Sequence, residues 1–418
     1  MSLFTPALMA VALALPSFAT VQDQSDENGF TSTHTPNEHT LGCLTAPTRQ
    51  CALNAPLQTV VDESLALERA RVLTAVAESL IDLGQTGRAR QTLTLALEEA
   101  RSAGLSLVMQ EKARQIAPLL ARAGQVDQAL KLAESIDIGN IQDQVYAGIA
   151  EEAANAGNMS GAQKALARMD DARRAFWREM KLLSRAPVAE IEARDLAALA
   201  DKVRGHDAML DRYRGLVLVG ILHHRLDQAK QRDALFDEAD ALLTGAVGNP
   251  ASARATAVKV RALYDADLGD SALFAPALEA ARSAISNLRS TGARQTMARL
   301  IGPAEAGTGA LSAALERLDD FGNLEERVRY FQTLSATDAT PAFLERVSVL
   351  LAAIESEIDD SYERDQLRLS LMAPVVASGA VDQAGAIVKA MEDDDNQAIG
   401  LARMAVMLSP GDGGDPAS

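Results

Sequence analysis

A nine-residue segment that ends in glycine recurs along the chain and is the strongest constraint on its fold. Clear copies are VAESLIDLG (76–84), IAPLLARAG (116–124), IAEEAANAG (149–157) and IGPAEAGTG (301–309), and a copy with one deletion is MAPVVASG (372–379). An alanine stands five residues after each glycine, at Ala89, Ala129, Ala162, Ala314 and Ala384. Glycine permits a left-handed turn at the end of a helix, and alanine permits a second helix to cross close to the first.

The spacing of these glycines indicates stacked helical hairpins. The first three are 40 and 33 residues apart, the 152 residues from Gly157 to Gly309 fit four units of 38, and Gly379 follows two units of 35 later. Such a period is typical of helical repeat proteins. The composition agrees, because 48% of the residues are apolar but only 4% are aromatic, which favours packed helices over sheets. We therefore predict an all-α superhelix, a solenoid of about nine stacked hairpins over residues 57–408.

The pattern resembles the tetratricopeptide repeat family, in which a glycine precedes a small alanine by five residues and apolar positions follow that alanine after four and seven. The later positions are filled here by Leu93 and Ala96, Ala133 and Ile136, Leu166 and Met169, and Val388 and Met391. The family's aromatic positions are mostly Ala or Leu in this chain, and its helix-ending proline is missing. The resemblance implies a superhelix with a binding groove, and a HEAT-like α-solenoid is the alternative.

Two details of the repeat allow further predictions. Pro118, Pro303 and Pro374 fall in one column, where each helix either kinks or breaks near its last turns, or simply starts one turn later. The segment 393–408, DDDNQAIGLARMAVML, is predicted to be a terminal capping helix, with acidic residues at its start that suit the helix dipole.

The N-terminus is typical of an exported protein. An apolar run from Ala7 to Leu15 is followed by Pro16 and the small-x-small pattern that ends at Ala19, although no Lys or Arg precedes the run. We predict a signal peptide over 1–19, a flexible leader over 20–56 and a disordered tail over 409–418. No later apolar stretch is long enough to span a membrane, so the expected location is periplasmic or secreted, in a bacterium.

The two cysteines fit an oxidising compartment. Cys43 and Cys51 lie eight positions apart in a loop-like segment that contains proline, and we predict a disulfide between them. A metal site that also uses His34 and His39 is an alternative, but its spacing matches no strong zinc pattern. Free thiols are the third possibility.

Charge and motifs narrow the function classes. The formal net charge of -17 argues against general nucleic-acid binding, which needs a basic surface. The nucleophile elbow, the H-E-x-x-H zinc motif and the P-loop are all absent from the sequence. We predict a protein that is not an enzyme and that has no catalytic residue, cofactor or metal.

One region departs from this acidic character. Residues 173–232 contain 13 basic and 8 acidic residues, and they include the only tryptophan. Interleaved basic and aromatic side chains can hold an acidic peptide or an anionic glycan. The predicted partner-binding residues are Arg173, Arg174, Phe176, Trp177, Arg178, Lys181 and Arg185. The alternative is a solvated helix whose Phe176 and Trp177 insert into the neighbouring repeat.

These features favour a scaffold that binds another protein or peptide of the cell envelope, possibly an acidic one, on a solenoid surface. A second interpretation is a helical-repeat protein that binds or processes cell-wall glycans, since such superhelices occur in soluble lytic transglycosylases. A third is self-association through the solenoid.

Overall fold

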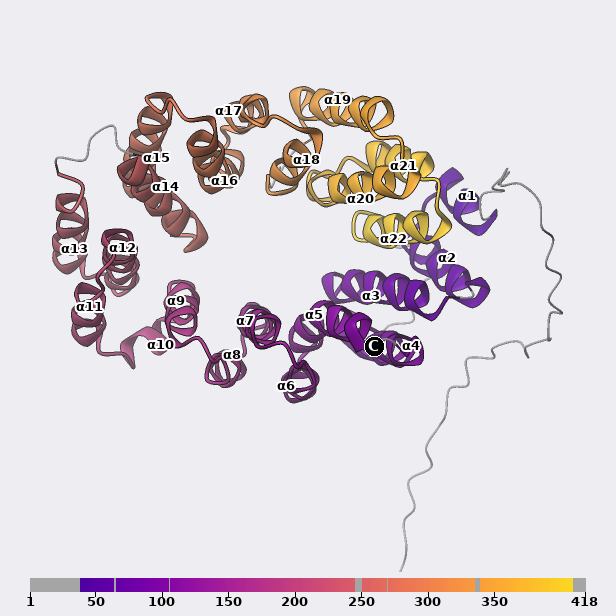
Figure 1. Cartoon of the computed structure of the whole chain (residues 1–418), viewed down its shortest axis with the longest axis horizontal. Helices are drawn as coiled ribbons and strands as arrows, with labels where there is room; N and C mark the ends of the chain where they lie inside the picture. The colour runs from indigo at the N-terminus through magenta and orange to yellow at the C-terminus, as the bar shows by residue number, and fades with distance from the viewer. Residues whose placement is uncertain are drawn as a thin grey trace, which may run out of the picture. The chain divides into compact units, whose positions relative to one another are not determined.

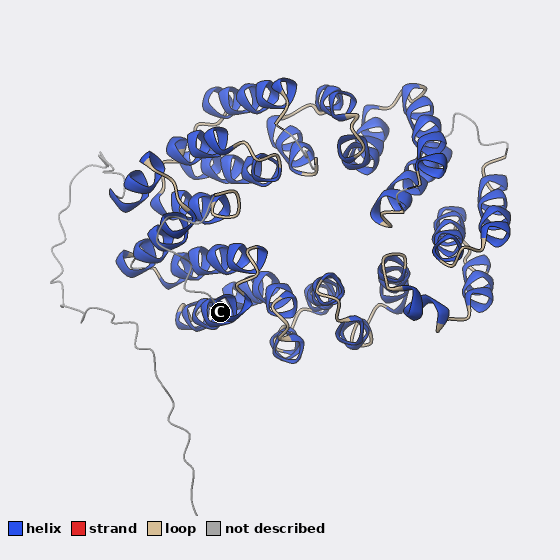
Figure 2. Cartoon of the chain, turned by 180° about the vertical axis from the view of Figure 1, so that it is seen from behind, coloured by secondary structure: helices blue, strands red, loops and turns tan. Residues whose placement is uncertain are grey.

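The computed structural model describes residues 38–63, 65–104, 106–244, 250–268, 270–334 and 339–408, all within one compact unit that spans 36–418. The described residues form helices and no strands (Figures 1 and 2). The first half contains α1 (Glu38–Thr45), α2 (Arg49–Asp62), α3 (Ala66–Asp82), α4 (Thr86–Ser102), α5 (Ser106–Arg122), α6 (Val126–Glu134), α7 (Gly139–Asn155), α8 (Met159–Leu166), α9 (Ala172–Leu183), α10 (Val188–Glu192) and α11 (Leu196–Arg204). The second half contains α12 (Met209–Arg225), α13 (Ala229–Ala241), α14 (Pro250–Asp265), α15 (Ser271–Ser286), α16 (Thr291–Gly307), α17 (Leu311–Glu316), the 3-10 helix η1 (Arg317–Asp320), α18 (Leu324–Gln332), α19 (Pro341–Glu357), α20 (Ser361–Ala377), α21 (Val381–Ala390) and α22 (Asp394–Met404).

The helices pack in neighbouring pairs, as the repeat predicts. Pairs such as α3 with α4, α7 with α8 and α12 with α13 are in contact. The first helices of successive pairs also contact one another, in the order α3, α5, α7, α9, α12, α14 and α16, and form the inner layer seen in Figure 1. This arrangement confirms the predicted all-α solenoid.

The glycine and alanine columns take the roles that the sequence assigns to them. All five glycines have a positive φ, between 74° and 87°. The residue after the glycine closes each turn, for example when Gln125 N donates to Leu120 O at 2.8 Å. All five alanines are fully buried. The left-handed turn and the close helix crossing are therefore both confirmed.

Two aspartates continue the glycine column through the middle of the chain. Asp227 and Asp267 have φ values of 56° and 48° at the ends of α12 and α14. Gln228 N donates to His223 O at 2.9 Å, which is the same turn bond as in the glycine copies. Aspartate tolerates the left-handed conformation better than most residues, so the repeat persists where its glycine is lost.

The prolines of the repeat lie inside unbroken helices. Pro118, Pro303 and Pro374 belong to α5, α16 and α20, and each helix begins well before its proline. The interpretation that these helices start one turn later is therefore wrong. A Cβ atom on Gly148 of α7 would lie only 2.9 Å from Pro118 Cγ, so this proline packs closely against the next inner helix.

The two ends of the helical series meet. The last helix, α22, contacts both α2 and α3, and α1 contacts α21 and α22 (Figures 1 and 2). We call the contact of α22 with α2 and α3 the seam. Arg71 of α3 donates to Asn396 Oδ1 of α22 at 2.7 Å across it, a pair 325 positions apart. The helices therefore form a closed series, in which α2 supplies the second helix that α22 would otherwise lack.

The seam corrects two predictions. The leader predicted to be flexible is helical from Glu38 onward, because α1 and α2 bury apolar residues such as Ala52 and Leu53. The segment after Asp393 is a helix, as predicted, but it does not cap a free end of the solenoid, because it packs against α2 and α3 and its residues 395–402 are all buried. The signal peptide, residues 20–37 of the leader and the tail lie outside the described residues.

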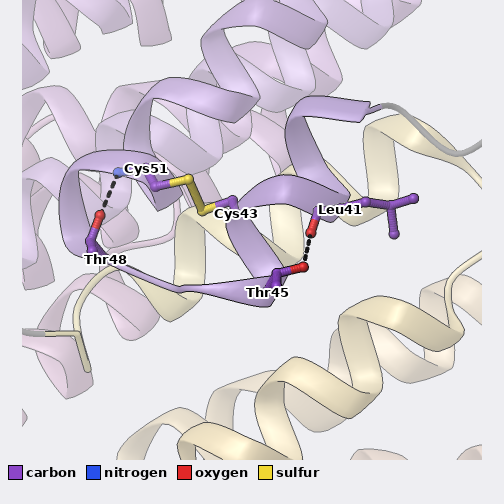
Figure 3. The surroundings of a disulfide bond; sticks show 5 residues. All are labelled: Leu41, Cys43, Thr45, Thr48 and Cys51. Carbon is purple, nitrogen blue, oxygen red and sulfur yellow. Dashed lines mark hydrogen bonds between the residues drawn. A yellow bond between two sulfur atoms is a disulfide. The ribbon is translucent and has the colours of Figure 1, made fainter.

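A disulfide joins the first two helices. Cys43 of α1 and Cys51 of α2 are bonded, with their Cα atoms 5.6 Å apart (Figure 3). Thr48 caps α2 by accepting a hydrogen bond from Cys51 N at 3.2 Å, while Thr45 Oγ1 donates to Leu41 O at 3.0 Å. The predicted disulfide is confirmed, and its cysteines are not metal ligands here.

Candidate functional site on the inner layer

Helix α9 presents its cations and its aromatic residues in a fixed arrangement. Asp171 caps the helix by accepting from Arg174 N at 2.9 Å. Phe176, Trp177 and Met180 are buried, which anchors the helix in the inner layer. Side chains three and four positions apart share one side of a helix. Three cations of α9 follow this spacing, at Arg174, Arg178 and Lys181, and Arg185 lies just beyond the end of the helix.

Arg174, Arg178 and Lys181 border a pocket of 550 Å³ between four inner helices, which we call the α9 pocket. Helices α7, α9, α12 and α14 all contribute to its wall. Its lining residues are Asp143, Gln144, Ala147, Met169, Arg174, Trp177, Arg178, Lys181, Arg214, Arg261 and Asp265. Five cations thus face two carboxylates around one hollow.

One carboxylate organises several of the cations. Glu151 of α7 lies 3.0 Å from Lys181, 3.3 Å from Arg185 and 3.4 Å from Arg178. Burial acts to raise the pKa of Glu151, but Lys181, Arg178 and Arg185 outweigh it and hold this pKa below its ordinary value. A single negative charge therefore positions three positive ones and leaves an excess of positive charge.

Arg214 of α12 is the least compensated of these cations. It forms no ion pair within the part of the chain that the structure describes, and its guanidinium lies over the Trp177 ring, 5.3 Å from the centroid. Burial, with a further contribution from Arg178, lowers the pKa of Arg214. Arg261 of α14, by contrast, is paired with Asp265 at 2.8 Å. An anionic group bound in the pocket would relieve the desolvated charge of Arg214.

The aromatic residues of α9 are partly structural. The Trp177 side chain is 8% exposed, and its ring packs against Phe176 and against His206, which lies in the next repeat. Lys202 of α11 lies over the Phe176 ring, 4.2 Å from its centroid. Phe176 does not line the α9 pocket, whereas Trp177 forms part of its wall. Both aromatics thus insert into the neighbouring repeat, as the alternative interpretation predicts, and one of them also faces the pocket.

The structure brings together four of the seven predicted binding residues. Arg174, Trp177, Arg178 and Lys181 line the α9 pocket, and Arg185 meets them at Glu151. Arg173 instead pairs with Asp211 of α12, outside the pocket lining. Arg214 and Arg261 are not among the predicted residues, because they reach the pocket only through packing of helices distant in sequence.

Other kinds of site are not evident in the described part of the chain. No group of three or more His, Cys, Asp or Glu side chains there is placed to hold a metal ion. Among the same residues, no helix has the length and apolar character needed to cross a membrane. No protein-family model matches the chain, and no curated protein matches it either.

Proposed function

We propose that this protein is an exported, non-enzymatic scaffold that binds an acidic, extended segment of another envelope protein in the α9 pocket. The observation that carries the proposal is the excess of cations over carboxylates around a hollow of 550 Å³ with an aromatic wall. Carboxylates of a ligand would pair with Arg174 and Arg214, while apolar atoms would pack on Trp177. The tetratricopeptide-like class of the repeats belongs to the same proposal and is supported by the column of glycines with positive φ and the column of buried alanines.

The proposed location is supported by the disulfide between Cys43 and Cys51, since disulfides persist mainly in oxidising compartments. Rigid inner helices also suit the binding of an extended segment, because side chains held on a scaffold lose little freedom when the ligand binds.

Trp177 provides a direct test, because it is the only tryptophan and it lines the pocket. We expect hexaglutamate to change the fluorescence of the mature protein saturably, and hexalysine to have no effect. The Arg174→Glu variant should bind hexaglutamate about tenfold more weakly, equivalent to about 1.4 kcal/mol, because it replaces an attraction with a repulsion. Added salt should weaken binding to the wild type.

Arg173→Glu is the matched control, because Arg173 is the neighbouring arginine on the same helix but does not line the pocket. Its affinity should stay within twofold of the wild type. Equal losses in both variants would reduce the effect to general surface charge and contradict the assigned site. Binding of an oligogalacturonate without binding of hexaglutamate would instead favour the glycan-binding alternative.

A further inference from the structure

A second pocket lies at the seam, where the two ends of the helical series meet. It has a volume of 420 Å³ and is lined from α3, α5 and α7 on one side and from α18, α20 and α22 on the other. Its charged lining residues are Arg71, Glu78, Lys112, Glu152 and Arg403. We call it the seam pocket, and it is complete only when the ends are in contact.

Lys112 of α5 is the most unusual group in this pocket. Lys112 is only 5% exposed, and its ammonium group forms no ion pair among the described residues. Its Nζ donates to Gln115 Oε1 at 3.3 Å, a weak compensation for a buried ammonium. Burial and then the nearby Arg71 lower the pKa of Lys112 to about 8. A buried cation of this kind is stabilised by an anion placed beside it.

A second cation reaches the pocket from the other end of the helical series. Arg403 of α22 donates to the backbone oxygen of Leu369 at 2.8 Å and has no ion pair within the described ranges. Burial lowers its pKa, as it does for Lys112. Arg71 is better compensated, since it binds Glu68 and Asn396. Two poorly compensated cations from opposite ends therefore face one hollow.

The carboxylates of the pocket do not neutralise these cations. Glu152 Oε2 lies 3.6 Å from Arg122 Nε. Burial raises the pKa of Glu152, so this carboxylate takes up a proton more readily than an exposed one does. Among the described residues Glu78 forms no ion pair with Lys112 or Arg403 within 4.0 Å, and its charge only partly offsets the effect of burial on the pKa of Arg403. Gln115, Gln332 and Gln366 add neutral amides to the lining, of which Gln115 donates to Glu111 and Gln366 donates to Asn396. The three cations of the lining outnumber its two carboxylates, which suits a small ligand that carries negative charge.

We propose that the seam pocket binds a small oxyanion, a carboxylate or a phosphate, held by Lys112 and Arg403. Because these two residues come from opposite ends of the helical series, the bound oxyanion stabilises the closed arrangement. A ligand that binds only the folded form raises stability in proportion to the logarithm of its concentration above its dissociation constant. This site is independent of the α9 pocket, so either proposal can fail without the other.

The test measures thermal unfolding and calorimetric binding of the full mature chain with sodium succinate or sodium phosphate, at an ionic strength held constant with sodium chloride. We expect at least one probe to raise the unfolding midpoint in a saturable manner. The Lys112→Met variant should fold, because it removes a buried charge, and should bind that probe at least tenfold more weakly. Lys131→Met, at an exposed lysine of α6, is the control and should bind within twofold of the wild type.

A pH series provides a second readout. Affinity should fall as the pH rises from 7 to 9, because Lys112 loses its proton near pH 8 and with it the attraction for the anion. The charged groups that face it are Arg71 and Glu68 on α3, and Glu111 on its own helix. A response to succinate alone identifies a carboxylate ligand, and a response to phosphate alone identifies a phosphate. No response to either probe, or undiminished binding to Lys112→Met, would overturn the proposal.

Discussion

The Glu305→Ala variant is expected to lose about 3 to 5 kcal/mol of its free energy of unfolding. Glu305 of α16 has a fully buried carboxylate that joins two arginines. It accepts from Arg282 of α15 at 2.9 Å, and from Arg317 of η1 at 2.6 and 2.8 Å. Removing it leaves both guanidinium groups without their partner, and neither is fully exposed to water. Urea unfolding measures the loss.

Two further variants separate the possible causes of that loss. Glu279 also lies near Arg282, at 4.0 Å, but its side chain is 77% exposed. Glu279→Ala should therefore change stability by less than about 1 kcal/mol, because exposed ion pairs contribute little. Glu305→Gln keeps an acceptor and should lose less than Glu305→Ala. Equal effects of Glu279→Ala and Glu305→Ala would show that burial of the pair is not what stabilises this repeat.

The local parts of the fold could be predicted because the residues that end one helix and allow the next to cross it lie within a single repeat. A glycine with a positive φ and an alanine with no exposed surface are needed wherever one helix ends and the next crosses it. The Gly124 and Ala129 pair shows both properties.

The third position of the nine-residue unit contributes to both pockets, a role that the sequence pattern alone did not reveal. Glu78 and Pro118 face the seam pocket, and Glu151 holds the cations of α9.

The seam could not be predicted, because no local pattern specifies contacts between residues more than 300 positions apart. Helix α2 is hidden in the sequence by Pro56 within it and by the polar residues before it. It is buried by packing against both α22 and α3. The same reasoning applies to the α9 pocket, since Arg214 and Arg261 reach it through packing of α12 and α14. A one-dimensional pattern can identify the face of a helix, but not which distant helix it meets.

Closure also changes the energetics expected of a repeat protein. In an open solenoid each repeat contacts only its neighbours, and the terminal repeats need polar outer faces. Here the last helix buries Asn396 and Gln397 as well as its apolar residues. Buried polar groups of this kind are usually paired. Asn396 Oδ1 accepts from both Arg71 and Gln366, whereas Asn396 Nδ2 and Gln397 Oε1 have no hydrogen-bond partner among the described residues. The stability of the seam therefore depends on polar contacts and on the charges around them.

Asp395 is the titratable group that should make the seam sensitive to pH. It lies in the first turn of α22, is 5% exposed, and its Oδ1 has no hydrogen-bond partner among the described residues. Burial raises the pKa of its carboxyl to about 7, and Glu63 adds to the effect while Arg71 opposes it. In the unfolded chain the same carboxyl titrates near 3.8.

The sign of the effect follows from these two pKa values. Between pH 4 and pH 7 the folded chain keeps a proton that the unfolded chain releases, so stability falls as the pH rises through this window. The contribution of Asp395 to this loss is about 4 kcal/mol at most, since each pKa unit corresponds to about 1.4 kcal/mol. Below pH 4 both states are protonated and this contribution vanishes.

The Asp395→Asn variant should therefore be more stable than the wild type at pH 8 and nearly equal to it at pH 4, as measured by urea unfolding at both values. Asp382→Asn, at an exposed position in the first turn of α21, is the control and should leave the pH dependence unchanged. If Asp395→Asn is no more stable than the wild type at pH 8, other groups of the seam stabilise the ionised carboxylate of Asp395, and its charge does not destabilise the seam. If it is more stable, the seam is most stable in mildly acidic surroundings, because the contact of α22 with α2 and α3 is formed around a carboxyl that remains protonated there.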